Sequence, residues 1–238
     1  EGREYVDIAA MWRAELPEEE RPEQASQSGW YQKAKDYWKG QAPTVDGMLG
    51  GLAEIHPADV AGSVSFLTTN TDVASKLQRD GVALDVGAGI GRVAKHVLGP
   101  IFREVDLLDS SEQFIEESKR YASDCGNIDR RICCPMEDFR PEPGRYQLVW
   151  IQWCIIYLAD ADLVRFLDQF VQAGVPLICI KDNITTRGFL VDKEDSSVTR
   201  SDAHMKKLFQ EAGLMVIGEQ VQEGLPEELF AVKMYALA

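Results

Sequence analysis

A cluster of glycines with an acidic neighbour carries the clearest chemical signal in the sequence. The stretch DVGAGIGR at 85–92 holds Gly87, Gly89 and Gly91. Glycine lets the backbone turn tightly and lets a ligand approach it closely, because it has no Cβ. The spacing is GxGxG, whereas dinucleotide-binding loops read GxGxxG. Asp85, two positions before the first glycine, would repel a pyrophosphate but would suit a cationic ligand.

A second carboxylate, Asp109, ends the next apolar run, EVDLLD. An acidic residue at this place can accept hydrogen bonds from ribose hydroxyls. S-adenosylmethionine combines a ribose with an ammonium, a sulfonium and a carboxylate, and it has no phosphate. Asp85 and Asp109 together therefore favour S-adenosylmethionine over NAD, with S-adenosylhomocysteine as the product. Arg92 would face the ligand carboxylate or lie on a helix surface, and the MEDF run at 136–139 would contact the adenine or form an ordinary acidic loop.

These residues belong to a regular alternation of apolar strands and amphipathic helices. Five apolar runs are expected as strands, at 82–86, 104–109, 131–134, 146–151 and 177–180. The intervening helices show apolar residues at i, i+3, i+4 and i+7, as in 163–170. The last two extended segments, 214–222 and 229–237, are too closely spaced for a helical crossover and should pair antiparallel.

This pattern predicts an α/β fold: a Rossmann-like, doubly wound, seven-stranded sheet, mostly parallel, with a C-terminal antiparallel hairpin and additional N-terminal helices. Ligands of such sheets bind beyond the carboxyl ends of the strands. The glycine loop and Asp109 both follow strands directly, so they are expected at the same edge.

The first part of the chain differs from the sheet region. Residues 1–29 are predicted to form an acidic N-terminal extension with a short amphipathic helix around Ile8, Met11 and Trp12, either flexible or packed on the domain. Residues 30–238 would form one domain, whose doubly wound sheet with its antiparallel hairpin resembles the class I methyltransferase arrangement. It begins with a helix at 30–39 that can act as a lid, and a longer helix is expected from about 57 to 79.

The composition restricts the partners. The formal net charge is −14 and 45% of the residues are hydrophobic. A nucleic-acid partner is not expected, because that binding depends on Lys and Arg against phosphates, whereas a basic protein partner is compatible. No membrane partner is expected, since no run approaches the roughly 18 apolar residues of a spanning helix. Because the first residues do not resemble a secretory signal, a cytoplasmic or nuclear location, or both, is expected.

Cysteines and histidines give no sign of a metal. The five cysteines show no CxxC spacing, and the three histidines match no ligand pattern. Reduced thiols and no metal are therefore expected. The pattern leaves the oligomeric state open.

The methyl acceptor should bind near the ends of the fourth and fifth strands. Methyl transfer is an in-line displacement, so an enzyme must align an unprotonated acceptor with the donor. The fourth strand ends in WIQW at 150–153 and lacks the Asn/Asp-Pro-Pro-Tyr stretch of adenine amino-methylating enzymes. After the fifth strand come Asn183 and a loop with Asp192, Asp195 and Ser197. A carboxylate-rich loop suits a cationic substrate.

A series of longer stretches makes the chain recognisable. They are YQKAKDYWK, PTVDGMLGG, LDVGAGIGR, IFREVDLLD, EDFRPEP, WIQW, IKDN and DSSVTR, spread over residues 30–238. In these stretches the chain resembles the eukaryotic protein α-N-terminal methyltransferases, which methylate the exposed α-amine of proteins that begin roughly X-Pro-Lys. The resemblance implies an S-adenosylmethionine-dependent enzyme that acts on N-terminal segments of basic proteins.

The resemblance also implies a role for each matching residue. The residues that would hold the cofactor are Gly87, Gly89, Arg92, Asp109, Met136, Glu137 and Gln152, together with Asp85 and Gly91 of the glycine loop. The peptide would lie in an aromatic slot of Trp38 and Trp153 beside Tyr37, with Asp192 and Ser197 reading its basic third side chain. Asn183 would hydrogen-bond the peptide near its amino end, and Asp195 would lie at the α-amine.

One position departs from the family pattern. The family commonly has a histidine four residues after the second Trp of WIQW, and this chain has Tyr157. Tyrosine has a reference pKa of about 10 and is a poor base near neutral pH. We therefore expect Tyr157 to orient the amine, with Asp195 accepting its proton or with the neutral amine selected from solution. The change could also alter substrate preference or the number of methyl groups added.

Other functions remain open from the sequence alone. A class I enzyme for a small amine metabolite would need a closed pocket in place of an open peptide channel. A non-catalytic module that binds N-termini would have no need of the glycine loop and Asp109.

Overall fold

The apolar runs form the centre of a sheet that is covered by helices on both faces. The computed structural model describes residues 2–16 and 29–238. Strand β2 (Val82–Val86) lies at the centre of the sheet, and all of its residues are buried. The strands around it are β3 (Glu104–Asp109), β4 (Ile128–Cys133), β5 (Tyr146–Gln152), β6 (Ile178–Thr185), β9 (Val216–Val221) and β10 (Ala231–Leu237). The order β4-β3-β2-β5-β6 is parallel, and β10 pairs antiparallel with β6 and β9. The predicted doubly wound sheet with its antiparallel hairpin is confirmed.

The sheet has more strands than the seven expected. A hairpin of β7 (Phe189–Asp192) and β8 (Ser197–Ser201) follows β6, and β8 pairs with β6 at Ile184 and Thr185. β1 (Arg3–Tyr5) then pairs antiparallel with β7, which makes a sheet of ten strands. The segment that was expected as a loop is extended because it pairs on both edges. This branch lies beyond the end of β5, where the acceptor site was expected.

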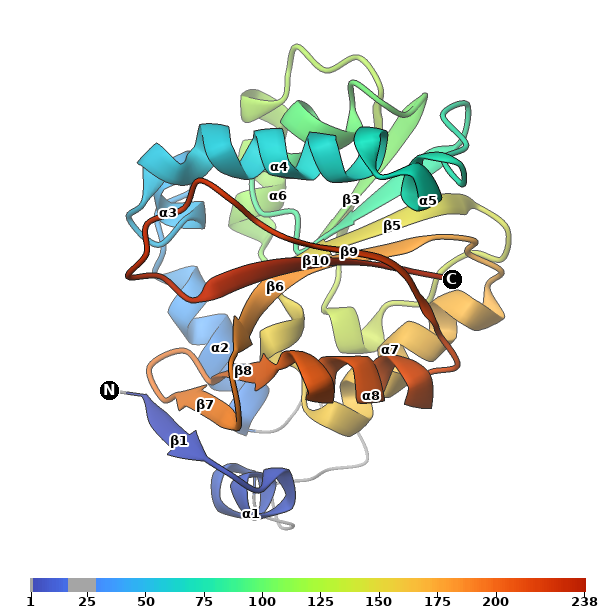
Figure 1. The fold of residues 1–238 in the computed structure, drawn as a ribbon. Helices are drawn as coiled ribbons and strands as arrows, with labels where there is room; N and C mark the ends of the chain where they lie inside the picture. The colour runs from blue at the N-terminus through green and yellow to red at the C-terminus, as the bar shows by residue number, and fades with distance from the viewer. Residues whose placement is uncertain (1, 17–28) are drawn as a thin grey trace.

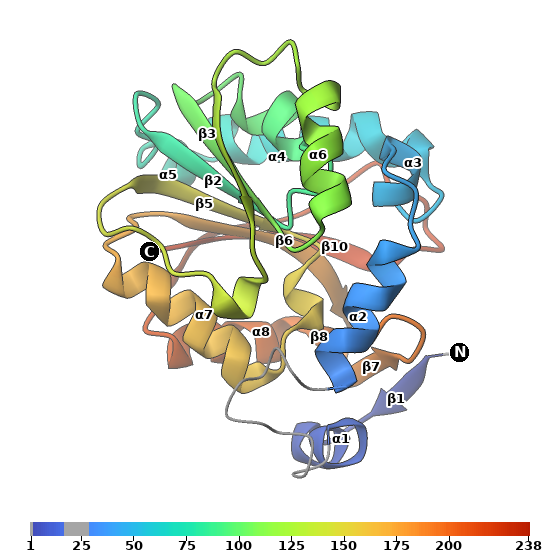
Figure 2. The ribbon, with the colours of Figure 1, turned by 180° about the vertical axis from the view of Figure 1, so that it is seen from behind.

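Helices cover the two faces, as the two ribbon views show (Figures 1 and 2). One face carries α4 (His56–Thr69), α5 (Thr71–Ala74), the short helix Ala94–Leu98 and α6 (Glu112–Tyr121). The other carries α7 (Asp160–Gln172) and α8 (Asp202–Glu211). The prediction of one helix from 57 to 79 was wrong. Asn70 is extended and its side chain accepts a hydrogen bond from Val73, so it ends α4 and begins a separate short helix.

The N-terminal residues are packed on the domain. α1 (Ile8–Glu15) begins at Asp7, whose side chain accepts a hydrogen bond from Ala10. Met11 is fully buried in the same apolar cluster as the strands. Of the two possibilities for the extension, residues 3–16 take the packed one. The lid region follows with α2 (Gly29–Lys39) and α3 (Val45–Met48), and the domain boundary at residue 29 stays a prediction.

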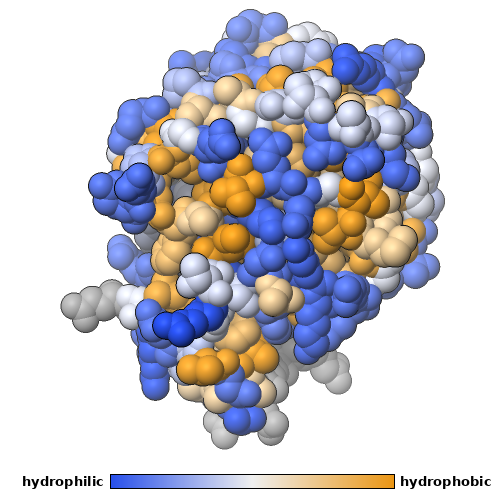
Figure 3. Space-filling view, in the orientation of Figure 1, coloured by the Kyte–Doolittle hydropathy of each residue, from blue (hydrophilic) through white to orange (hydrophobic). Residues whose placement is uncertain are grey.

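Figure 3 shows a face dominated by hydrophilic residues, with hydrophobic residues in separate patches. In the described ranges, no helix has the length and apolar character needed to cross a membrane.

Candidate active site

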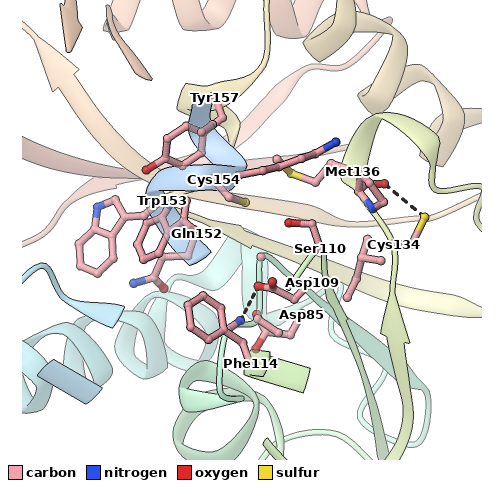
Figure 4. A pocket seen from close by; sticks show the side chains of 18 of the residues that line it. Asp85, Asp109, Ser110, Phe114, Cys134, Met136, Gln152, Trp153, Cys154 and Tyr157 are labelled. Carbon is pink, nitrogen blue, oxygen red and sulfur yellow. Dashed lines mark hydrogen bonds between the residues drawn. The ribbon is translucent and has the colours of Figure 1, made fainter. Parts of the chain in front are cut away.

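A cavity opens beneath α2, at the carboxyl ends of β2, β3 and β5. Its empty volume is about 1070 Å³, including its opening to solvent. In Figure 4, Asp85 and Asp109 lie on one side of it, Trp153 and Tyr157 on another, and Cys134 and Met136 at the far end. The residues singled out from the sequence that line the cavity are Trp38, Asp85, Gly87, Gly89, Arg92, Asp109, Met136, Glu137, Gln152, Trp153 and Tyr157.

The glycine loop turns so tightly that two of its positions, Gly87 and Gly89, favour glycine. Gly87 and Gly89 have φ of +66° and +55°, in the left-handed region. A Cβ on Gly87 would lie 2.7 Å from the Cβ of Cys154, and one on Gly89 would collide with the sulfur of Met48. Gly91 is different, because it faces side chains of β3 and α6 and does not line the cavity. Its φ of +84° favours glycine, whereas an added Cβ would make only ordinary contacts.

Asp109 is held by backbone amides at the end of β3. Its Oδ2 accepts a hydrogen bond from Gly89 N and its Oδ1 one from Ser111 N, both at 2.8 Å. Burial raises the pKa of Asp109, and these amides oppose the rise. A carboxylate offers about four acceptor positions, so two remain after these bonds. They suit a pair of ribose hydroxyls.

Asp85 lies deeper in the cavity wall. Its side chain is 1% exposed, and burial raises its pKa to about 7. Its Oδ2 accepts a hydrogen bond from Ala94 N at 2.9 Å. A ligand that brings a positive charge to this cavity would favour the ionised form of Asp85. The position therefore fits the ammonium of S-adenosylmethionine.

Arg92 is buried, so of its two expected placements the surface one is excluded. Its Nη1 lies 2.6 Å from Oδ2 of Asp59, a fully buried residue of α4. The other oxygen of Asp59 lies 2.6 Å from Lys181 Nζ and accepts a hydrogen bond from Gln152 Nε2 at 2.8 Å. One carboxylate thus joins the glycine loop, β5 and β6, and it fixes two residues that line the cavity.

This buried network carries an excess of positive charge. Burial works to raise the pKa of Asp59, but Arg92 and Lys181 outweigh it and the pKa is lowered. Burial lowers the pKa of Lys181 to about 8, against the attraction of Asp59. With Lys181 charged there are two cations for one anion. Arg92 has five N–H donors, so its guanidinium can also hold a ligand carboxylate, which would balance the charge.

The acceptor side begins at Trp153, directly after β5. Its backbone has φ of +51°, which is unusual for a bulky residue. The indole Nε1 donates a hydrogen bond to Asn183 Oδ1 at 3.2 Å, and the Arg92 guanidinium lies 5.9 Å from the ring centre. Strained backbone of this kind often occurs at functional sites, where the surrounding structure holds it. Trp153 thus connects the cofactor cavity to Asn183 on β6.

Tyr157 closes the slot opposite α2. It lies in a short 3-10 helix, Ile155–Tyr157, and its ring centre is 6.2 Å from that of Trp38. Its hydroxyl donates a hydrogen bond to Asp195 Oδ2 at 3.0 Å. Burial and the charge of Asp195 raise the pKa of Tyr157 well above its usual value, although a hydrogen bond from Trp38 opposes them. Tyr157 is therefore a neutral donor at physiological pH.

The acidic turn, residues 192–196 between β7 and β8, lies beyond Tyr157. Burial raises the pKa of Tyr37, and so do the negative charges of Asp195, Glu194 and Asp192. The charge of the turn therefore acts on Tyr37 of α2. Tyr37, Asn183, Asp192, Asp195 and Ser197 do not line the cofactor cavity itself. They form a second, acidic region next to it, which suits a substrate that extends out of the cavity.

Several residues of the site were not singled out from the sequence. Asp59 and Lys181 were missed because the partners of a buried charge are set by tertiary contacts. Glu194 could have been identified as part of the acidic turn, because it lies between Asp192 and Asp195 in the sequence. His56 and His96, which match no ligand pattern in the sequence, lie with ring centres 4.9 Å apart, and His56 contacts Arg92. In the described part of the chain, no three potential ligands are grouped for a metal ion.

Comparisons with known proteins agree with this geometry. A family model described as AdoMet-dependent proline di-methyltransferase matches residues 26–238. The alpha N-terminal protein methyltransferase 1 of Arabidopsis thaliana is 39% identical over 252 residues, which cover 100% of this chain and 88% of that protein. The N-terminal Xaa-Pro-Lys N-methyltransferase 1 of Homo sapiens is 42% identical over 211 residues, 87% of this chain and 95% of that protein.

A solved structure supports the fold throughout the chain. A SAM-dependent methyltransferase of Leishmania major superposes with a TM-score of 0.88 at 41% sequence identity. The match covers 98% of this chain and 92% of that one. The superposition therefore includes the sheet and the lid of this chain as well as most of its N-terminal segment.

Proposed function

The chain belongs to the family of AdoMet-dependent proline di-methyltransferases, and from this premise we propose that it methylates the α-amino group of proteins that begin X-Pro-Lys. It is an S-adenosylmethionine-dependent enzyme, and the residues around the cavity fit that cofactor. Asp109 would hold the ribose, Asp85 would face the ammonium and Arg92 the carboxylate. When bound, the cofactor supplies the methyl group as an activated sulfonium.

The observation that carries the proposal is the hydrogen bond between Tyr157 and Asp195 at the border of the two regions. It holds a carboxylate beside the slot of Trp38 and Trp153, where an amine could approach the donor. Burial raises the pKa of Asp195, which is then closer to that of the amine. A carboxylate in this place can attract the ammonium form of the N-terminus, accept its proton and keep the lone pair directed at the methyl group.

The acidic turn supports a substrate that is basic at its third position. The negative charges of Asp192 and Glu194 act on Tyr37 together with that of Asp195. These residues lie outside the lining of the cofactor cavity. A small amine would leave them unused, so a peptide is the better substrate for the whole site. The non-catalytic alternative is disfavoured because the glycine loop, Asp85 and Asp109 are assembled around a cavity.

A direct comparison of acceptors tests the proposal. Release of S-adenosylhomocysteine would be measured with a Ser-Pro-Lys peptide, its N-acetylated copy, a Ser-Pro-Glu peptide and phosphoethanolamine. We expect turnover with Ser-Pro-Lys, far less with Ser-Pro-Glu, and none with the acetylated peptide or the small amine. Equal turnover with phosphoethanolamine would favour the small-amine function, and turnover with the acetylated peptide would exclude the α-amine as acceptor.

A further inference from the structure

The N-terminal residues 3–16, here called the clamp, contact the acidic turn from outside the cavity. β1 pairs antiparallel with β7 in the register Arg3 with Val191 and Tyr5 with Phe189. Both ribbon views show β1 alongside β7 at the edge of the sheet (Figures 1 and 2). The strand to which it pairs ends at Asp192, where the acidic turn begins.

The helix of the clamp reaches the turn itself. The carboxylate of Glu15 lies 3.3 Å from Lys193 Nζ, within the turn, and 3.8 Å from the guanidinium of Arg3. Tyr5 also donates a hydrogen bond to Glu15. The Glu15 side chain is only 10% exposed. These contacts tie the strand and the helix of the clamp to each other and to the acidic turn.

A third set of contacts joins the clamp to the lid. The Trp12 ring meets that of Trp30, on α2, edge-on with centres 5.4 Å apart. The guanidinium of Arg200, on β8, lies 5.9 Å from the Trp12 ring centre. Trp30 in turn donates a hydrogen bond to the backbone oxygen of Tyr157 at 2.8 Å. The clamp thus contacts the hairpin of β7 and β8, and it also contacts Trp30, which is hydrogen-bonded to Tyr157.

Buried side chains of the hairpin, such as Val191 and Val198, anchor it in the core, but its backbone pairing with the rest of the sheet is short. β8 pairs with β6 only at Ile184 and Thr185. A two-stranded hairpin alone is marginally stable in water. Without β1, the outer edge of β7 would also be an unpaired strand edge. The clamp therefore supplies backbone pairing on the open edge of the hairpin and an ion pair at the acidic turn.

We propose that residues 3–16 position the acidic turn against Tyr157 and thereby set the affinity of the site for its cationic peptide. This rests on the proposed function, because the turn would bind the peptide. No clamp residue lines the cofactor cavity. Glu15 and Trp12 are therefore positioning residues that act through Lys193, Arg200 and Trp30.

The test compares Glu15→Gln and Trp12→Ala with Arg13→Ala, which changes an exposed residue of the same helix. Peptide KM, kcat and the Kd of S-adenosylhomocysteine would be measured, together with hydrogen exchange over 189–201. We expect Glu15→Gln to raise the peptide KM about threefold, as loss of a partly buried ion pair allows. Trp12→Ala should raise it more. In both variants the Kd of S-adenosylhomocysteine should stay unchanged, and hydrogen exchange in residues 189–201 should become faster. The Arg13→Ala enzyme should match the wild type in all of these measurements.

Two results would overturn the clamp. One is an unchanged peptide KM and unchanged exchange in both variants. The other is a parallel loss of cofactor affinity, which would indicate general destabilisation. Inactivity of the wild-type protein on every X-Pro-Lys peptide would overturn the proposed function instead. The exchange measurement would then decide the clamp alone, since faster exchange confined to 189–201 supports it and unchanged exchange contradicts it.

Discussion

The hydroxyl group of Tyr157 lies 3.0 Å from Oδ2 of Asp195, and burial raises the pKa of both groups. The phenol is therefore the donor and the carboxylate the acceptor of this bond. Tyr157 therefore stays neutral and cannot take up a proton near pH 7. We therefore expect deprotonation of the amine to fall to Asp195, or to solvent before binding.

Replacement of Asp195 tests this assignment first. Asp195→Asn keeps the size of the side chain but removes the charge and the proton acceptor. We expect kcat/KM for a Ser-Pro-Lys peptide to fall by about 10²- to 10⁴-fold, the usual contribution of a positioned acid or base. Glu194→Gln, in the same turn, is the control and should cost far less. A fully active Asp195→Asn enzyme would show that the neutral amine is selected from solution.

The pH dependence of the reaction tests the role of Tyr157. The hydrogen bond from Tyr157 lowers the pKa of Asp195, against the larger raising effect of burial. Tyr157→Phe removes this bond, so the pKa of Asp195 should rise. Activity that requires ionised Asp195 is lost as pH falls through its pKa, so the acid limb of kcat/KM should move to higher pH. An acid limb at the same pH in both enzymes would contradict the coupling.

Asp109 offers a test of the cofactor site. Both of its oxygens accept backbone N–H groups, so an amide at this position must turn its NH₂ toward a donor. Asp109→Asn should weaken S-adenosylhomocysteine binding by about tenfold or more, since hydrogen bonds to a charged group contribute about 1.5–3 kcal/mol. Calorimetric titration would measure it, with Glu112→Gln, an exposed neighbour, as the control. An unchanged Kd would remove Asp109 from the ribose site.

The sequence predicts the fold in most respects because its signals are local. The apolar run at 82–86 is buried on both faces, and the closely spaced final strands can only pair antiparallel. The hairpin of β7 and β8 was not predicted, because its strands are short and are stabilised by partners distant in sequence. One of those partners is β1, at the other end of the chain.

Site residues could be predicted from the sequence where the residue type and its position in the motif point to a single role. Gly87 and Gly89 adopt backbone angles that favour glycine, and Asp109 is the last residue of its strand. Asp59 was not predictable. Its helix gives no sign that it meets Arg92 and Lys181 from two other elements. Ion pairs between buried charges of this kind depend on the assembled fold. They restrict which substitutions the site can accept.

The Asp59 network should therefore dominate the stability of the cavity wall. Asp59→Asn preserves shape but leaves Arg92 and Lys181 without their anion. Removal of one partner from a buried ion pair costs about 3–5 kcal/mol, and we expect the free energy of unfolding in urea to fall by that amount. Glu54→Gln, exposed just before α4, should change it by less than about 0.5 kcal/mol. Equal stability of the two variants would contradict the network.

The most direct test of the central claim is where the methyl group is attached. A Ser-Pro-Lys peptide would be incubated with the protein and S-adenosylmethionine, and fragmented in a tandem mass spectrometer. The account predicts mass increments of one methyl group each on fragments that contain the N-terminal residue, and none on the lysine side chain. Methyl groups on the lysine, or increments on an N-acetylated peptide, would contradict it.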